Sequence, residues 1–250
     1  MAKPVGYGGR DYPDFGISDT VLTKSIITDM GELAARLGAP NVFDRMGNIV
    51  WSEQFEYGLG SWQLGSTGGG LDPVLVAHPY LYKPYALKFA SEAGSTGGSI
   101  TQINLHLPYE SALGIEFAFN PNFRATTLEL YINVYTGAKY YAFGAEFQLK
   151  NGIIRLYKQG GGYNNVYSNP LGYTRSDNYH VVKLVMDLAN GLYKRLMFGN
   201  LDIDVTGKTL HVGTSGTRPS MTLLFRLESA ADYDEVLFLD NVIITLDEPV

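Results

Sequence analysis

Apolar and polar residues alternate strictly along several segments in the middle of the chain. The clearest segment is TLELYINVY, residues 127–135. Because every second residue of a β-strand points to the same side, this segment has an apolar side and a polar side. The apolar side holds Leu128, Leu130, Ile132 and Val134, and the polar side holds Glu129, Tyr131, Asn133 and Tyr135. The pattern predicts a strand with one buried face.

The same division recurs in three other segments. Their apolar positions are Ile115, Phe117 and Phe119; Phe143, Ala145 and Phe147; and Ile154 and Leu156. The polar positions between or beside them are Glu116, Glu146, Gln148, Arg155 and Tyr157. We therefore predict a sheet that buries an apolar face and presents tyrosine, carboxylate, amide and guanidinium groups on the other.

Turn signals separate these apolar runs from Asn41 onward, as in an antiparallel all-β domain. Two are especially plain, Asn151-Gly152 and Asn190-Gly191. Asn-Gly suits the positive φ angles of a two-residue type I′ hairpin turn. We expect a meander of hairpins that forms a sandwich domain over residues 49–250.

The first part of the chain, residues 1–48, has a different pattern. Gly, Pro, Asp and Tyr dominate its beginning, and no alternation of strand length occurs there. One short helix is predicted at about residues 29–37, with Asp29 as N-cap and Gly38 after its end. Such a helix is too short to be stable alone. We expect an N-terminal arm whose helix docks on its own sandwich or on a neighbouring subunit.

Composition narrows the function classes. The net charge is −6, which gives no electrostatic reason to expect nucleic-acid binding. The chain has no cysteine, which excludes disulfides and thiolate sites. No apolar run approaches the roughly 20 residues of a membrane-spanning helix, and no classical export signal is present. We expect a protein made in the cytoplasm that does not insert into membranes.

Tyrosine is the most informative residue type, with 18 Tyr against 2 Trp. Its ring and hydroxyl suit contact with a sugar or with a protein partner. Because no tryptophan cluster is present, protein contact is expected slightly ahead of glycan contact. The candidate residues for binding a glycan or a partner are Tyr131, Tyr135, Glu146, Arg155, Tyr157, Tyr163, Asn165 and Tyr167.

Two short stretches suggest a family. SEQFEYGLGSWQ, with Phe55 and Trp62, resembles the first strand of carbohydrate-binding jelly rolls, and VLFLDNVIIT, with Asp240 and Asn241, resembles their last strand. Residues 179–210 are similar to concanavalin A-like and laminin-G-like sandwiches. The resemblance implies two packed antiparallel sheets, with sugars bound across one face or at the loop rim.

The resemblance also implies a candidate structural calcium site. In such jelly rolls a glutamate of the first strand and an aspartate of the last strand often join backbone carbonyls around the ion. Carried over to this chain, these residues are Glu56 and Asp240. The alternative is that Asp240 caps a strand end or hydrogen-bonds a neighbouring loop. No other cofactor is expected.

Enzymatic motifs are not evident. Laminarinase-like glucanases carry Glu-x-Asp-x-x-Glu on one strand, and this string does not occur. The carboxylates Glu116, Glu129 and Glu146 come singly from different segments of the predicted polar face. We expect them to be solvated or to pair with Arg155 and Arg226. The sequence therefore favours a protein that is not an enzyme.

The arm-plus-sandwich build resembles bacteriophage decoration, head-fibre and tail-associated proteins. We expect a virion structural protein anchored by its arm to a capsid or tail protein, with self-association and a sandwich that can also bind a cell-surface glycan. The alternatives are a lectin-like carbohydrate-binding module and, behind it, a glycoside hydrolase of concanavalin A-like fold.

Overall fold

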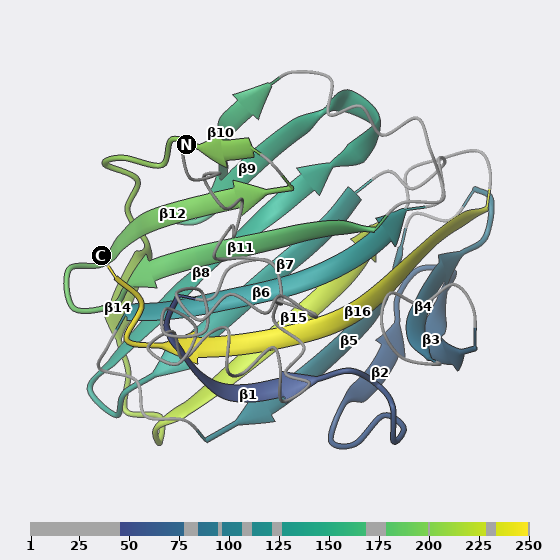
Figure 1. Cartoon of the computed structure of the whole chain (residues 1–250), viewed down its shortest axis with the longest axis horizontal. Helices are drawn as coiled ribbons and strands as arrows, with labels where there is room; N and C mark the ends of the chain where they lie inside the picture. The colour runs from purple at the N-terminus through teal and green to yellow at the C-terminus, as the bar shows by residue number, and fades with distance from the viewer. Residues whose placement is uncertain are drawn as a thin grey trace, which may run out of the picture. The chain divides into compact units, whose positions relative to one another are not determined.

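The part of the chain that the structure describes consists of β-strands joined by turns. The computed structural model describes residues 46–77, 85–94, 97–106, 112–121, 127–168, 179–199, 201–228 and 234–249. From Asn48 onward these residues form two antiparallel sheets (Figure 1). Apart from residues 46–48, the predicted arm and its helix lie outside the described residues, so both stay predictions.

Sheet A contains the first and the last strand of the described chain. Its strands are β1 (Asn48–Glu53), β3 (Gly70–Val76), β4 (Ala86–Ser91), β6 (Ala112–Pro121), β11 (His180–Asp187), β12 (Leu192–Phe198), β13 (Leu201–Ile203) and β16 (Glu235–Leu246). Their order is β13-β12-β11-β6-β16-β4-β3, and β1 pairs with the second half of β16. Figure 1 looks onto this sheet, with sheet B behind it.

Sheet B contains the predicted meander. Its strands are β2 (Gln63–Ser66), β5 (Gly98–Leu105), β7 (Thr127–Tyr135), β8 (Lys139–Gln148), β9 (Ile153–Tyr157), β10 (Tyr163–Ser168), β14 (His211–Thr214) and β15 (Ser220–Glu228). Their order is β10-β9-β8-β7-β15-β5-β2, and β14 pairs with β8. A short 3-10 turn, η1 (Leu149–Asn151), lies between β8 and β9.

The two sheets pack face to face. Phe117 of sheet A lies 5.0 Å from Phe225 of sheet B, and Phe119 lies 5.9 Å from Phe147, between ring centroids. The predicted apolar residues of β7 are fully buried in the same core: Leu128, Leu130, Ile132 and Val134. The prediction of an all-β fold with two antiparallel sheets is therefore confirmed.

The two Asn-Gly hairpins are confirmed, but their predicted turn type is wrong. The loops are four residues long, because Gln148 pairs with Ile153 and Asp187 pairs with Leu192. Gly152 and Gly191 have φ angles of 63° and 67°, whereas neither preceding asparagine is among the non-glycine residues with positive φ. Four-residue turns that end in a left-handed glycine therefore replace the two-residue type I′ turns, and the first of them contains a 3-10 turn at Leu149–Asn151.

Glu116 does not share a face with Glu129 and Glu146, so that prediction is wrong. Glu116 lies on β6 of sheet A, opposite Lys183 of β11, and is 1% exposed. The predicted apolar side of β6 is confirmed, since Ile115 is fully buried in the core. Alternation gives the side of a strand but not the sheet to which the strand belongs.

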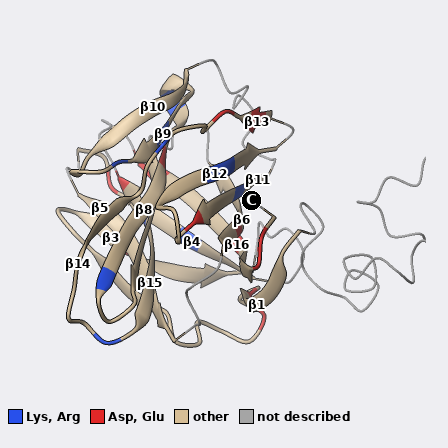
Figure 2. Ribbon diagram, turned by 90° about the vertical axis from the view of Figure 1, so that its left-hand side faces the viewer, with Lys and Arg blue, Asp and Glu red and all other residues tan. Residues whose placement is uncertain are grey.

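Most positions on the strands are uncharged, with Lys, Arg, Asp and Glu at a few places (Figure 2). One buried group joins the end of β16 to β11 and β12. Glu248 contacts Lys183 at 2.8 Å and Arg195 at 3.2 Å, and it accepts a hydrogen bond from Thr245. The Glu248 side chain has no exposed surface, so this ion pair network is part of the folded core.

Candidate functional site

The polar face of sheet B is built by the register of its strands. Glu129 of β7 lies opposite Arg226 of β15 and opposite Glu146 of β8. Glu146 lies opposite Arg155 of β9, which lies opposite Asn165 of β10. Directly opposed residues have Cβ atoms about 5 Å apart, so the five form one continuous row. We call these five residues the charged row.

Ion pairs run along the charged row. Arg226 donates from Nε and Nη2 to Oε2 of Glu129 at 2.7 and 2.6 Å. Arg155 donates from Nη1 to Oε1 of Glu146 at 2.7 Å and from Nε to Oδ1 of Asn165 at 3.1 Å. The side chains of Glu129 and Glu146 are each 10% exposed. The expectation that these carboxylates pair with Arg155 and Arg226 is confirmed.

Glu228 adds a third carboxylate at the end of β15. Its Oε1 lies 2.6 Å from Nη2 of Arg226, so two carboxylates share one guanidinium. Burial raises the pKa of Glu228; Arg226 opposes this rise, and Glu129 and Glu146 add to it. Taken together, the charged row and Glu228 hold one more carboxylate than guanidinium groups.

Aromatic rings lie beside the charged row. The ring of Tyr157 stands edge-on to Tyr131 and Tyr163, at centroid distances of 5.1 and 5.4 Å. His211 lies 6.2 Å from Tyr157 and 5.4 Å from Tyr140. All of these rings are half-buried. We call this cluster the tyrosine face; it consists of Tyr131, Tyr135, Tyr140, Tyr157, Tyr163 and His211.

Tyr163 joins the tyrosine face to the charged row. Its hydroxyl donates to Oε1 of Glu129. Burial raises the pKa of Tyr163, and the charge and hydrogen bond of Glu129 raise it further. Burial is also the main cause of the raised pKa of Tyr131, followed by its hydrogen bond with Tyr157. Both side chains therefore present hydroxyl groups rather than phenolates at neutral pH.

The hydrogen bonds of His211 assign its tautomer. The N–H of Gly160 donates to Nδ1 at 3.0 Å, so this nitrogen carries no proton in the neutral ring. The proton is then on Nε2, which lies 2.7 Å from the hydroxyl oxygen of Tyr140. Because Nε2 donates to that oxygen, the hydroxyl proton of Tyr140 points away from His211.

The turn between β9 and β10 holds β14 in place. Residues 160–162 are glycines with φ angles of 84°, 91° and 75°, a region that side chains disfavour. Beside them, Oε1 of Gln159 accepts the N–H of Val212 at 2.7 Å, and Nε2 donates to the carbonyl of Val212 at 3.4 Å. The glycines therefore permit a turn that fixes the strand carrying His211.

The hydroxyl group of Tyr193, a residue of β12 in sheet A, lies at the edge of β8. It lies between the part of β8 that pairs with β9 and the part that pairs with β14. β9 pairs with residues 145–148 of β8, and β14 pairs with residues 139–142. At this point the hydroxyl of Tyr193 accepts the N–H of Gly144 at 3.0 Å and donates to the carbonyl of Tyr157 at 2.8 Å. Tyr193 is 2% exposed. It thereby fixes the backbone of the residue at the centre of the tyrosine face.

Most of the binding residues predicted from the sequence lie together on this face. They are Tyr131, Tyr135, Glu146, Arg155, Tyr157, Tyr163 and Asn165. Tyr167 is separated from them, because a bulge after Asn165 places it opposite Ile154 and packs it against the core. The extra residue of a bulge reverses the alternation. That the gathered residues bind a ligand stays a prediction.

Sequence reasoning missed Tyr140 and His211. Tyr140 carried a usable signal, because it shares the even-numbered side of β8 with Glu146. His211 carried none, since its strand has four residues and its partner Tyr140 lies 71 positions away. A short strand with a distant partner leaves no pattern in the sequence.

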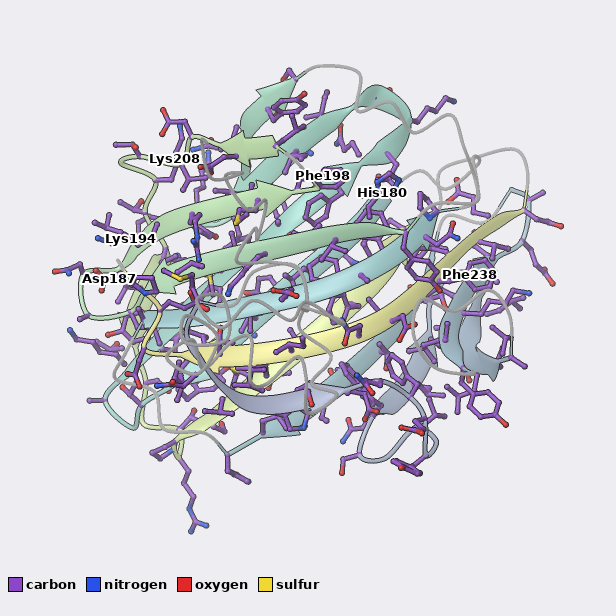
Figure 3. All side chains as sticks on the ribbon, viewed as in Figure 1. His180, Asp187, Lys194, Phe198, Lys208 and Phe238 are labelled. Atoms are coloured by element: carbon purple, nitrogen blue, oxygen red, sulfur yellow. The ribbon has the colours of Figure 1, made fainter. Side chains whose placement is uncertain are left out.

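Two other titratable groups, at opposite ends of β11, belong to the packing of sheet A (Figure 3). The ring of His180 stacks on Phe198 at 5.5 Å, and burial lowers its pKa. Asp187 accepts hydrogen bonds from Asn190 at 3.0 and 2.7 Å and lies 3.3 Å from Lys194. These contacts hold the hairpin between β11 and β12.

The predicted calcium site stays a prediction. Pairing of Glu53 with Val242 brings the turn that holds Glu56 alongside the part of β16 that holds Asp240. Within the described ranges, however, no three His, Asp or Glu side chains cluster in a way that could hold a metal ion. The remaining ligands would have to be backbone carbonyl groups.

The carboxylates Glu129 and Glu146 lie opposite each other on neighbouring strands, and retaining glycosidases also use two neighbouring carboxylates. Each one, however, accepts hydrogen bonds from its own arginine. The arrangement is that of two adjacent ion pairs, and it supports a role in holding groups in position.

None of the helical turns in the described segments is long and apolar enough to cross a membrane.

Comparison with known proteins gives a shared fold. No protein-family model and no curated protein matches the sequence. A carbohydrate esterase from Shiga toxin-encoding bacteriophage phi24B aligns over 81% of this chain and 100% of its own, with 12% identity and a TM-score of 0.51. The protein HCR/D-Sa-GBL1/C aligns over 80% of this chain and 48% of its own, with 11% identity and a TM-score of 0.50. At these identities the likeness concerns the fold alone.

Proposed function

We propose that this chain is a non-enzymatic carbohydrate-binding protein whose jelly-roll sandwich contacts the glycan through the tyrosine face. The observation that carries the proposal is the register of sheet B, which places five tyrosine rings beside the ion-paired charged row. A sugar presents an apolar ring face and several hydroxyl groups. Aromatic rings and paired polar groups on one surface match both features.

The polarity of the surroundings favours a glycan over a protein partner. The core of a protein interface is depleted in charged residues, whereas here the rings adjoin glutamate–arginine pairs. Polar groups continue across the same sheet, where Thr222 donates to Asn104 at 2.7 Å and Gln102 donates to Gln63 at 2.8 Å. Composition alone placed protein contact ahead of glycan contact, and the structure leads us to reverse that ranking. The fold shared with a bacteriophage carbohydrate esterase lends support.

Binding of the full chain to an array of immobilised oligosaccharides tests the proposal. We expect selective binding to a subset of glycans. The double variant Tyr131→Ala/Tyr157→Ala is expected to lose this binding, while Tyr57→Ala, at a residue 95% exposed and outside the tyrosine face, is expected to keep it. Absence of binding to any glycan, or equal binding by the three proteins, would contradict the proposal.

The virion role belongs to the same proposal. The predicted arm over residues 1–48, followed by a sandwich, would suit a component that anchors on a capsid or tail protein, associates with itself and projects a recognition domain. A fold similar to that of a bacteriophage protein supports this setting. Quantitative mass spectrometry of purified particles tests it: a fixed copy number relative to the capsid protein is expected, and absence from particles would contradict it.

A further inference from the structure

Both guanidinium groups of the charged row are already paired with carboxylates of the protein. Each guanidinium of the charged row contacts a carboxylate at 2.7 Å or less, and Arg226 contacts both Glu129 and Glu228. The charged row and Glu228 together hold three carboxylates and two guanidinium groups, so their surplus charge is negative. The contribution of Glu129 and Glu146 to the raised pKa of Glu228 agrees with a surplus of negative charge.

An anionic ligand would bind weakly to this arrangement. To reach a guanidinium it would have to displace Glu146 from Arg155 or a carboxylate from Arg226. If Glu146 were displaced, its carboxylate would be left beside the anionic ligand. The Glu146 side chain is only 10% exposed. Partly buried like charges that are not paired repel strongly.

A hydroxyl group meets no such obstacle. A guanidinium carries five N–H donors and a carboxylate about four acceptor positions, so each pair keeps hydrogen-bonding capacity after its internal contacts are made. A sugar hydroxyl both donates and accepts, and it can therefore bridge Glu146 and Arg155 without breaking their ion pair. Side chains of Arg155 and Arg226 are 33% and 35% exposed, which leaves them accessible.

The tyrosine face extends the same chemistry. The hydroxyl of Tyr163 is held by Glu129, and the hydroxyl proton of Tyr140 points away from His211. Neither group brings a positive charge to the rings. Rings and neutral hydroxyl groups suit the faces of unmodified sugar rings.

We propose that the ligand of the tyrosine face is an uncharged glycan, whose hydroxyl groups bind the glutamate–arginine pairs of the charged row while its rings lie on the tyrosines. This inference rests on the proposed function and adds the class of glycan. It distinguishes neutral hexose polymers from glycans that carry uronic or sialic acid carboxylates.

Calorimetric titration of the full chain tests the inference. The probes are neutral hexose oligosaccharides selected on the array and oligosaccharides of equal length that carry uronic or sialic acids. We expect the neutral series to bind more tightly, with affinity that changes less than about twofold between about 50 and 500 mM NaCl, because no net ion pairing with the ligand is involved. Tighter binding of the acidic series, weakened by salt, would overturn the inference while the proposed function stands.

The variant Glu146→Gln gives an independent test, because it keeps the shape of the side chain and frees the Arg155 guanidinium from its carboxylate. Affinity for the neutral oligosaccharide is expected to fall by about two- to tenfold, and affinity for the acidic one is expected to rise. Glu92→Gln makes the same charge change at an exposed turn and is the control. Unchanged affinities in Glu146→Gln would overturn the inference. Failure of both series to bind the wild-type chain would overturn the proposed function, and this inference with it.

Discussion

The hydroxyl oxygen of Tyr140 lies 2.7 Å from Nε2 of His211, and this contact links three parts of sheet B. Tyr140 belongs to β8 and His211 to β14, while Nδ1 of His211 accepts the N–H of Gly160 in the turn between β9 and β10. The imidazole of His211 thus connects β8, β14 and the turn between β9 and β10.

We expect His211→Phe to lower the free energy of unfolding by about 1 to 2 kcal/mol, because the ring volume is kept and two hydrogen bonds are lost. Urea unfolding followed by fluorescence measures the change. His106→Phe, at an exposed residue, is the control and is expected to change stability little. Equal stability of the two variants would show that His211 does not connect these elements.

Removal of the hydroxyl oxygen of Tyr193 tests how much its hydrogen bonds contribute to stability. Tyr193→Phe leaves the N–H of Gly144 without the hydroxyl that accepts it, and a buried unsatisfied group costs about 1–3 kcal/mol. Guanidinium unfolding is the measurement, with Tyr57→Phe at a residue 95% exposed as the control. If both variants unfold at the wild-type denaturant concentration, the hydroxyl has no such role.

The buried carboxylate of Glu248 provides a third prediction. Glu248→Gln removes the charge that Lys183 and Arg195 contact at 2.8 and 3.2 Å. Loss of one partner of a buried ion pair costs about 3–5 kcal/mol, so we expect a large fall in the thermal midpoint. Glu92→Gln, at an exposed position, is expected to melt like the wild type. A midpoint close to that of Glu92→Gln would contradict the prediction.

Asp187 makes stability depend on pH. Burial raises its pKa, but the hydrogen bonds from Asn190 and the charge of Lys194 outweigh this and hold the pKa below its ordinary value of 3.8. A carboxyl group with a lowered pKa stabilises the fold above its unfolded-state pKa, and this stabilisation disappears as the pH falls through the folded-state value.

We therefore expect Asp187→Asn to lose about 1 kcal/mol of stability at neutral pH. The difference from the wild type is expected to shrink below about pH 4. Urea unfolding at several pH values measures it. A difference that stays constant down to about pH 2 would show that the ionised carboxylate is not its source.

Local patterns predicted the two faces of β7 and the gathering of polar groups on sheet B. They failed where the position of a residue depends on pairing between distant strands or on an irregular backbone. The bulge after Asn165 turns Tyr167 toward the core, and Glu116 lies in the opposite sheet although its strand alternates in the same way. The position of His211 depends on the pairing of β14 with β8, and no spacing in the sequence encodes that pairing.

The most direct test of the account is to locate the bound glycan with 13C-tyrosine NMR of the full chain, with resonances assigned by single Tyr→Phe variants. On titration with an oligosaccharide selected on the array, we expect the signals of Tyr131, Tyr157 and Tyr163 to shift. The signals of Tyr57 and Tyr85, which are 95% and 40% exposed outside the tyrosine face, are expected to stay. Shifts confined to Tyr57 or Tyr85, with the tyrosine face unchanged, would contradict the account.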